Sequence, residues 1–214
     1  MPETRAAAVK EVLIAQRVLP VLRLSTAPVP AEVVEILAEE GFSCLEIALT
    51  TPKVFSSLRA LVERYGEKLI IGAGSAVNAE MARLAVRAGA RFVACHALCT
   101  PMVEACRQQD VLPIPGIMTA TEALQAWHLG ADLVKVFPAH LMGPSYLEEL
   151  RRPLPWQKYV ATGGITAENA ASFLAAGAVA VAVGHWLVKD EDVWTGDWAG
   201  VRSRARELKA AVAV

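Results

Sequence analysis

One lysine lies inside an apolar stretch of the chain, where a charged side chain is costly to bury. Lys135 stands in the middle of residues 131–138, with valine on each side. In a strand, alternation places Lys135 on one face with Leu133 and Phe137, away from the valines. Removal from water favours the neutral amine, a nucleophile that forms Schiff bases with carbonyl substrates. The alternative is a lysine paired with a buried carboxylate for structural reasons alone.

A glutamate stands in a second apolar stretch of the same kind. In residues 44–50, Glu46 shares a face with Ala48 and Thr50, and leucine and isoleucine take the other. A glutamate is seldom fully buried without a partner, and Lys135 is the candidate. A carboxylate beside a lysine Schiff base can move protons directly or through a water molecule. A purely structural ion pair is again the alternative.

Segments of small residues follow three of the apolar stretches, at residues 72–75, at residues 162–165 and at Gly184. Thr162-Gly163-Gly164 precedes a helix that we expect to begin near Thr166. Backbone N–H groups in such a loop can hold a carboxylate or a phosphate near the helix N-terminus. Glycine loops also serve as tight turns, so each loop indicates a ligand-binding site only in combination with Lys135.

These stretches belong to a repeating pattern of an apolar run, a turn and an amphipathic helix. The runs are rich in Val, Ile and Leu without strict alternation, which is typical of strands buried on both faces of a parallel sheet. Eight of them are present: residues 18–24, 44–49, 69–73, 92–95, 111–114, 133–137, 159–161 and 179–183. Eight such units predict an α/β fold, a (β/α)8 TIM barrel. Active sites of these barrels assemble at the carboxyl ends of the strands.

The barrel is expected to occupy residues 1–214 as a single domain, with residues 1–16 forming an extra N-terminal helix. Helices are expected over 31–40, from Pro52, after Asn78 and after Thr166. Several should end at a glycine, at Gly41, Gly89, Gly130 and Gly177. A doubly wound open sheet is the alternative fold, but no predicted strand is followed by the GxGxxG pattern of that class.

The composition assigns the apolar stretches to a protein core. Hydrophobic residues make up 54% of the 214 and charged residues 20%, and the mean hydropathy is +0.37. The longest weakly polar run, residues 173–184, is shorter than the roughly 18 residues that a membrane-spanning helix needs. With 21 Lys and Arg against 22 Asp and Glu, no polycationic surface is indicated. We therefore expect no membrane or nucleic-acid partner and, without an export signal, a cytoplasmic location.

Four cysteines lie in or beside apolar segments, at positions 44, 95, 99 and 106. Three of them stand with His96 in the pattern C-H-x2-C-x6-C, which resembles half of a zinc site. Structural zinc sites usually combine two short ligand pairs, and the second pair is missing here. Buried, inert thiols are the favoured interpretation, and no metal is expected.

Together, these segments resemble the class I aldolases that cleave 2-keto-3-deoxy-6-phosphogluconate and 4-hydroxy-2-oxoglutarate. The resemblance extends from about Val18 to Lys189. It rests on VLPVLR, EIALTTP, IGAGSAVN, KVFPA, TGGI and VGHWLVK, in the family's order and spacing. It implies a (β/α)8 barrel, usually a homotrimer, that forms pyruvate and an aldehyde such as glyceraldehyde 3-phosphate or glyoxylate. No cofactor is implied.

The resemblance also implies roles for individual residues. Lys135 corresponds to the Schiff-base lysine and Glu46 to the acid/base. The substrate-binding positions are Arg23, Thr50, Ser75, Phe137, Thr162, Gly163, Gly164, Gly184 and His185. Among them, Arg23 and Ser75 match positions that place the pyruvyl carboxylate, and the three glycines match the phosphate-binding backbone.

Several positions depart from the family pattern. Thr50 stands where many members carry arginine, and His96 and His140 replace other residue types. His185 occupies the place of a serine that contacts phosphate, and a partly protonated histidine can bind phosphate or a second carboxylate. Phosphogluconate-, phosphogalactonate- and hydroxyoxoglutarate-type substrates therefore all stay open. Two further alternatives are a phosphate-binding isomerase or synthase on the same barrel and a non-catalytic ligand-binding trimer.

Overall fold

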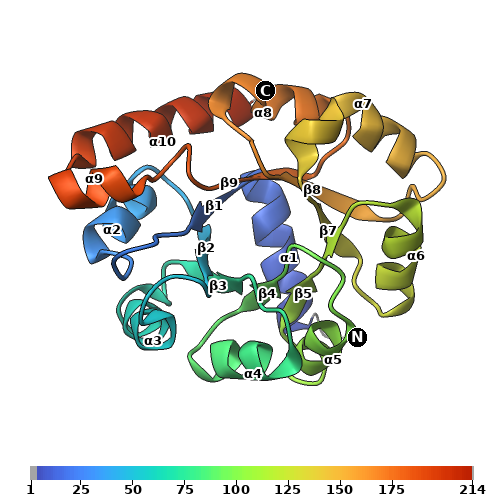
Figure 1. Ribbon diagram of the computed structural model, residues 1–214, viewed down its shortest axis with the longest axis horizontal. Coiled ribbons are helices and arrows are strands. Elements are labelled where there is room, and N and C mark those ends of the chain that lie inside the picture. Colours follow the sequence, from blue (N-terminus) through green and yellow to red (C-terminus); the bar gives the residue numbers. More distant parts are fainter. Residues whose placement is uncertain (1–3, 214) are drawn as a thin grey trace.

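The computed structural model describes residues 4–213, in which parallel strands form a barrel inside a ring of helices (Figure 1). The predicted (β/α)8 TIM barrel is confirmed. The strands are β1 Val18–Leu22, β2 Cys44–Ala48, β3 Ile70–Gly74, β4 Phe92–Ala94, β5 Leu112–Ile114, β6 Gly116–Ile117, β7 Leu133–Val136, β8 Lys158–Thr162 and β9 Ala180–Val183. The helices are α1 Arg5–Gln16, α2 Ala31–Glu39, α3 Val54–Tyr65, α4 Ala79–Arg87, α5 Thr100–Arg107, α6 Ala120–His128, α7 Ala139–Arg151, α8 Ala167–Ala175, α9 Asp190–Thr195 and α10 Trp198–Val212.

The barrel closes through a strand position that is divided in two. The strand order is β5-β4-β3-β2-β1-β9-β8-β7-β6, and β5 and β6 are separated along the chain by Pro115 alone. β5 pairs with β4, and β6 pairs with β7. Across the junction, the Lys135 N–H donates to the Pro115 carbonyl at 2.8 Å. β6 was not predicted, because proline and glycine at 115–116 interrupt the apolar run that marks a strand.

Period-2 alternation divides the apolar side chains between two cores. Leu133 lies in the barrel interior with residues such as Leu19, Phe92 and Val160. Val134 belongs to the larger core between the strands and the helices. Lys135, two positions beyond Leu133 on β7, therefore projects into the barrel, as the alternation predicted.

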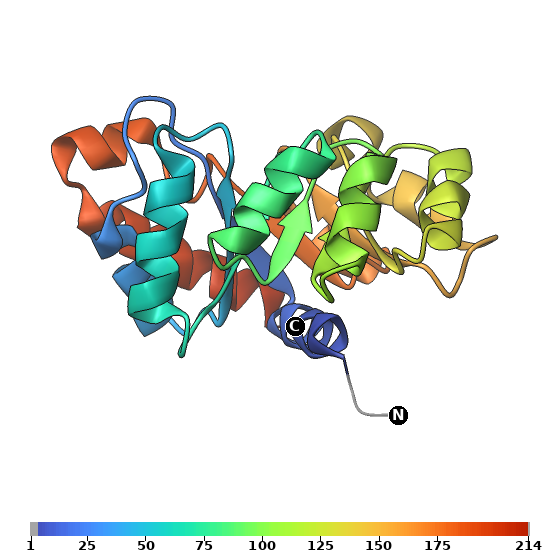
Figure 2. The same cartoon turned by 90° about the horizontal axis from the view of Figure 1, so that it is seen from below.

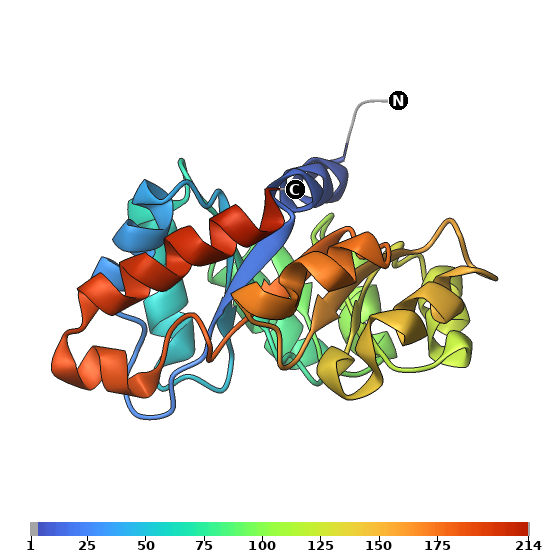
Figure 3. The same ribbon diagram turned by 90° about the horizontal axis from the view of Figure 1, so that it is seen from above.

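Helix α1 covers the amino-terminal opening of the barrel. Val9 and Leu13 are buried and belong to the interior core. Figures 2 and 3 show α1 on the outside of the ring of helices, across one end of the barrel. The predicted N-terminal helix is present from Arg5, and residues 1–3 of that prediction lie outside the described residues. With this end covered, the carboxyl ends of the strands are the open end.

Helix boundaries follow the local signals with one correction. The side chain of Asn78 caps α4 by accepting from the Met81 N–H at 2.8 Å. The glycines expected at helix ends all adopt positive φ, between 79° and 100°. The helix expected from Pro52 instead begins at Val54, because residues 50–53 form turns and Lys53 adopts a left-handed conformation, φ 53°. Among residues 4–213, no helix combines the length and apolar character needed to cross a membrane.

Candidate active site

Lys135 and Glu46 form a buried ion pair inside the barrel. The Lys135 Nζ lies 2.6 Å from Glu46 Oε2, and the two side chains are 6% and 3% exposed. Lys135 comes from β7 and Glu46 from β2, which are separated by β8, β9 and β1 in the sheet. The pair therefore spans the interior from one side of the barrel to the other. Two desolvated charges are stable only with close mutual contact, which 2.6 Å provides.

Gly74 makes room for the Glu46 carboxylate. A Cβ at Gly74 would lie 2.0 Å from Glu46 Oε1, and one at Gly72 would lie 2.3 Å from the Phe92 ring. Both glycines belong to β3, so the small-residue segment that was predicted to follow the strand lies largely within it. These glycines therefore provide space for inward-pointing side chains, which strand alternation did not reveal.

Arg23 is held at the ends of the first three strands. Its Nη1 donates to Thr50 Oγ1 at 2.8 Å, and its Nη2 donates to Ser75 Oγ at 2.9 Å. Ser75 adopts a left-handed conformation, φ 65°, directly after β3. A guanidinium has five N–H donors, so Arg23 can bind a carboxylate while it keeps both hydroxyl contacts. Thr50 and Ser75 thus act on the site through Arg23.

A cavity of about 530 Å³ opens beside Lys135 at the carboxyl ends of β1, β7, β8 and β9. Eight of the predicted site residues line it: Arg23, Lys135, Phe137, Thr162, Gly163, Gly164, Gly184 and His185. The other three contact lining residues, Glu46 through Lys135 and Thr50 and Ser75 through Arg23. The structure therefore brings all the predicted residues to one end of the barrel.

Two side chains hold the glycine loop after β8. His140 Nδ1 lies 3.1 Å from the Gly163 carbonyl oxygen, a contact that requires the ring proton on Nδ1, and Asn169 Nδ2 donates to the Gly164 carbonyl at 3.0 Å. Because a trans peptide is planar, the N–H groups of Gly164 and Ile165 point away from these two side chains. Both residues line the cavity. His140, which had no assigned role, thus positions the loop.

The loops that follow β1 and β9 are joined to each other. Asp190 accepts from the Ser25 N–H at 2.8 Å and from Ser25 Oγ at 2.9 Å. The backbone hydrogen bond from Ser25 is the main reason that the pKa of Asp190 lies below its usual range. Trp194 Nε1 also donates to Thr26 Oγ1 at 2.8 Å. Arg23 and His185 therefore stand on loops that support each other.

Sequence reasoning missed part of the cavity wall. Val21, Ile165, Thr166, Ala182, Trp186 and Lys189 also line it. Among them, Lys189 is the charged residue, and it lies five positions after Gly184 in the segment VGHWLVK. That proximity to a predicted site glycine was the available signal. The polar residues that follow Lys189 instead favoured its interpretation as an ordinary surface lysine.

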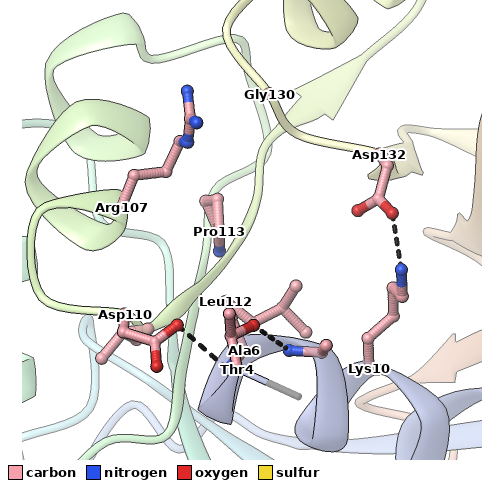
Figure 4. Close-up of a pocket in the computed structure, with 11 residues that line it drawn as sticks. Thr4, Ala6, Lys10, Arg107, Asp110, Leu112, Pro113, Gly130 and Asp132 are labelled. Carbon is pink, nitrogen blue, oxygen red and sulfur yellow. Dashed lines mark hydrogen bonds and ion pairs between the residues drawn. The ribbon is translucent and has the colours of Figure 1, made fainter. Parts of the chain in front are cut away.

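A second cavity, of about 360 Å³, lies at the opposite end of the barrel beside α1 (Figure 4). Lys10 reaches Asp132 at 2.6 Å, and Asp110 accepts from the Arg5 N–H at 2.9 Å. Arg107 donates to the Leu129 carbonyl at 2.7 Å. Lys10, Asp132 and Asp110 are thus engaged in joining α1 to the barrel, whereas Arg107 joins α5 to the end of α6. Lys135 and Glu46 do not line this cavity.

The cysteines do not gather around a possible metal site in the described part of the chain. No group of three or more His, Cys, Asp or Glu side chains within residues 4–213 is arranged to hold an ion. Cys95 and Cys106 are buried. Burial raises the pKa of both thiols, that of Cys106 to about 12, and so keeps them protonated. They act as small apolar side chains.

Comparison with known proteins identifies consistent similarities. The sequence model of the family described as KDPG and KHG aldolase matches residues 9–203. The chain is 31% identical over 199 residues to 2-dehydro-3-deoxy-phosphogluconate aldolase of Treponema pallidum, across 92% of this chain and 94% of that protein. It is 32% identical over 178 residues to 2-dehydro-3-deoxy-6-phosphogalactonate aldolase of Escherichia coli, across 81% and 87%.

A solved structure extends the similarity to the fold. KDPG aldolase from Legionella pneumophila, with pyruvate captured as a covalent carbinolamine intermediate, superposes with a TM-score of 0.84 at 25% identity. The match covers 94% of this chain and 97% of that one. The similarity thus extends over nearly the whole of both chains.

The buried ion pair generates a prediction about stability. Glu46→Leu leaves the Lys135 ammonium without a partner, so the free energy of unfolding should fall by about 3–5 kcal/mol. Adding Lys135→Met should restore most of that loss, because no unpaired charge then stays buried. Urea unfolding at constant protein concentration measures both variants. Arg87→Met, which breaks the exposed pair with Glu80, is the control and should cost about 0–1 kcal/mol. A double variant that is no more stable than Glu46→Leu alone would contradict the prediction.

Proposed function

The chain belongs to the KDPG and KHG aldolase family, and from this premise we propose that it cleaves a 2-keto-3-deoxy acid to pyruvate and an aldehyde through a Schiff base on Lys135. One observation carries the assignment of the nucleophile. Lys135 is a buried lysine in the wall of the cavity, with a carboxylate 2.6 Å from its nitrogen. An amine and a proton acceptor at this distance are the requirements of class I aldolase chemistry.

The first step is formation of the nucleophile. Glu46 takes a proton from the Lys135 ammonium, and the neutral amine attacks the C2 ketone of the substrate. The C–N bond forms as the C=O π bond breaks, and a proton moves from the attacking nitrogen to the carbonyl oxygen, which gives a carbinolamine with a hydroxyl group. Glu46 then returns its proton to the departing hydroxyl, water leaves, and an iminium remains on Lys135. The short contact between Nζ and Oε2 lets one carboxyl group serve both transfers.

The iminium then provides the electron sink for cleavage. Glu46, a carboxylate again after dehydration, takes the proton of the C4 hydroxyl. The C3–C4 bond breaks, and its electron pair moves into an enamine while the aldehyde leaves. Glu46 returns that proton to C3 of the enamine, and hydrolysis of the regenerated iminium releases pyruvate and the free lysine. The iminium supplies the electrophilic character that a metal ion supplies in other aldolases, so this route requires no metal or organic cofactor.

The remaining cavity residues bind the two ends of the substrate. Arg23, held by Thr50 and Ser75, receives the C1 carboxylate next to the reacting ketone. Phe137 and Thr162 form the wall beside Lys135. The loop of Gly163 and Gly164, together with Gly184 and His185, receives the distal end. An anionic group there accepts hydrogen bonds from backbone N–H groups.

The proposed substrate class includes three compounds, which differ in their distal group or stereochemistry. The distal group is a phosphate in 2-keto-3-deoxy-6-phosphogluconate and in its galactonate isomer, and a carboxylate in 4-hydroxy-2-oxoglutarate. Trapping experiments separate the aldolase from a phosphate-binding isomerase or synthase and from a non-catalytic ligand-binding trimer, because neither alternative requires an amine at this position.

Reductive trapping tests the nucleophile. Incubation with pyruvate and borohydride should attach one reduced pyruvyl group per chain at Lys135, because borohydride reduces the iminium to a stable amine. Peptide mass spectrometry locates the adduct. Lys135→Met should abolish it, and Lys10→Met should leave it unchanged. An adduct on another lysine, or none on Lys135, would remove the basis of the proposed function.

His185 generates a prediction about substrate choice. A serine hydroxyl at this position can donate to a phosphate oxygen and takes less space than an imidazole. His185→Ser should therefore raise kcat/KM for 2-keto-3-deoxy-6-phosphogluconate over 4-hydroxy-2-oxoglutarate by about fivefold, the equivalent of roughly 1 kcal/mol for one hydrogen bond. Pyruvate release measures both rates. His128→Ser, at the exposed end of α6, is the control. An unchanged ratio would show that His185 does not select the distal group.

We propose that three copies of the chain associate. The family resemblance implies a trimer, and exposed apolar side chains support an association surface. Trp127 and Trp156 are 39% and 48% exposed, with ring centroids 6.1 Å apart, and Leu124 of α6 is also exposed. Sedimentation velocity should give three times the 22.9 kDa mass of one chain. The mass of a monomer or dimer would contradict this proposal and leave the aldolase chemistry unaffected.

We also propose that the protein acts in the cytoplasm on a small keto acid, with no membrane or nucleic-acid partner. All four cysteines are unpaired, which supports a reducing compartment. The near balance of acidic and basic residues supports the absence of a nucleic-acid partner. Fractionation of cells that produce the protein tests the location.

A further inference from the structure

The charged side chains that line the active-site cavity are all basic. They are Arg23, Lys135 and Lys189, with His185 as a further titratable group of the cavity. No Asp or Glu is among its lining residues in the described chain; Glu46 contacts the cavity through its pair with Lys135. Arg23 receives one carboxylate in the proposed reaction. Lys189 is then a second cation without an assigned task.

The backbone of Lys189 is held firmly in place. Its N–H donates to Asp192 Oδ2 at 2.7 Å, and Asp192 is a buried carboxylate. Arg204 pairs with the same oxygen and also donates to the Leu187 carbonyl at 3.0 Å. The start of the Lys189 side chain is thus fixed in the cavity wall. Binding through it therefore costs less ordering entropy than binding through a lysine on a loose loop.

The carboxylates near Lys189 have other partners. Asp192 pairs with Arg204, and Asp190 accepts hydrogen bonds from Ser25. Among residues 4–213, no carboxylate forms an ion pair with the Lys189 ammonium. The side chain is half-buried in the cavity wall. A cation in this position is suited to an anion supplied by a ligand.

We propose that Lys189 is a specificity-determining residue whose ammonium binds the distal anionic group of the substrate, a phosphate monoester or a carboxylate. The inference rests on the proposed function, which places that group beside Gly163, Gly164 and Gly184. The Lys189 ammonium compensates in part for the serine hydroxyl that would contact phosphate at position 185, where this chain has His185. Because a phosphate monoester carries more charge than a carboxylate, Lys189 favours the phosphorylated substrate.

Three substrates with different distal groups test this role. The test compares 2-keto-3-deoxy-6-phosphogluconate, the uncharged-tail analogue 2-keto-3-deoxygluconate, and 4-hydroxy-2-oxoglutarate. Lys189→Met keeps the length of the side chain and removes its charge. It should raise KM for the phosphorylated substrate about tenfold, as expected for one charge-assisted hydrogen bond. KM for 4-hydroxy-2-oxoglutarate should rise less. For 2-keto-3-deoxygluconate, KM and kcat should both stay the same.

Two further variants control for charge and shape. Lys189→Arg keeps a cation and should retain most of the affinity for the phosphorylated substrate. Lys68→Met removes an exposed lysine at the opposite end of the barrel and should change nothing. The split between KM and kcat is informative, because the distal contact is far from the reacting bond and should leave kcat within about twofold.

Trapping with pyruvate and borohydride separates the possible failures, because pyruvate has no distal group. If the unaltered protein is not trapped at Lys135, the proposed function fails, and this inference fails with it. If Lys189→Met is trapped like the unaltered protein, its site is intact. An unchanged KM for both anionic substrates, or an equal loss with 2-keto-3-deoxygluconate, would then overturn the role of Lys189 alone. Inorganic phosphate, used as a competitive inhibitor, should likewise bind about tenfold more weakly to Lys189→Met.

Discussion

The buried contact between Lys135 and Glu46 is the interaction on which the rest of the site depends. Two charges inside a barrel lose their hydration, and only a close partner offsets that loss. The contact joins β7 to β2 across the interior, so it requires the strand order of a closed barrel. It also requires Gly74, since a Cβ there would overlap the Glu46 carboxylate. Closure of the sheet and the absence of a side chain at Gly74 are thus both conditions for the proposed chemistry.

The residues that we propose to bind the substrate are positioned by contacts between loops. Arg23 is fixed by hydroxyl groups from the ends of two other strands, and the glycine loop is fixed by His140 and Asn169. Asp190 joins the loops that follow β1 and β9. Each contact orients a donor before the substrate arrives, and preorganised donors are the main source of electrostatic stabilisation in enzymes. The barrel supplies the loop positions, and the hydrogen bonds set their orientation.

Local patterns predicted those features whose cause lies within a few residues. Lys135 and Glu46 were found because each breaks an apolar run, and period-2 alternation predicted their inward direction. The eight strands and the glycine helix ends followed from the same kind of signal. β6, the space at Gly74 and the place of Lys189 in the cavity wall were missed. Each depends on a neighbour distant in sequence, such as β7, Glu46 or the wall of the cavity, and spacing along one chain does not report such neighbours.

The ion pair also explains how one arrangement serves a reaction with several intermediates. Before the reaction, the interior holds a lysine cation beside a carboxylate. After dehydration in the proposed reaction, it holds an iminium cation on the same nitrogen beside the same carboxylate. The positive charge of the ammonium and that of the iminium therefore occupy the same position beside Glu46. The groups around them do not need to reorganise between the two states. A barrel that stabilises the resting pair of Lys135 and Glu46 is, by the same contacts, complementary to the iminium through which the carbon–carbon bond breaks.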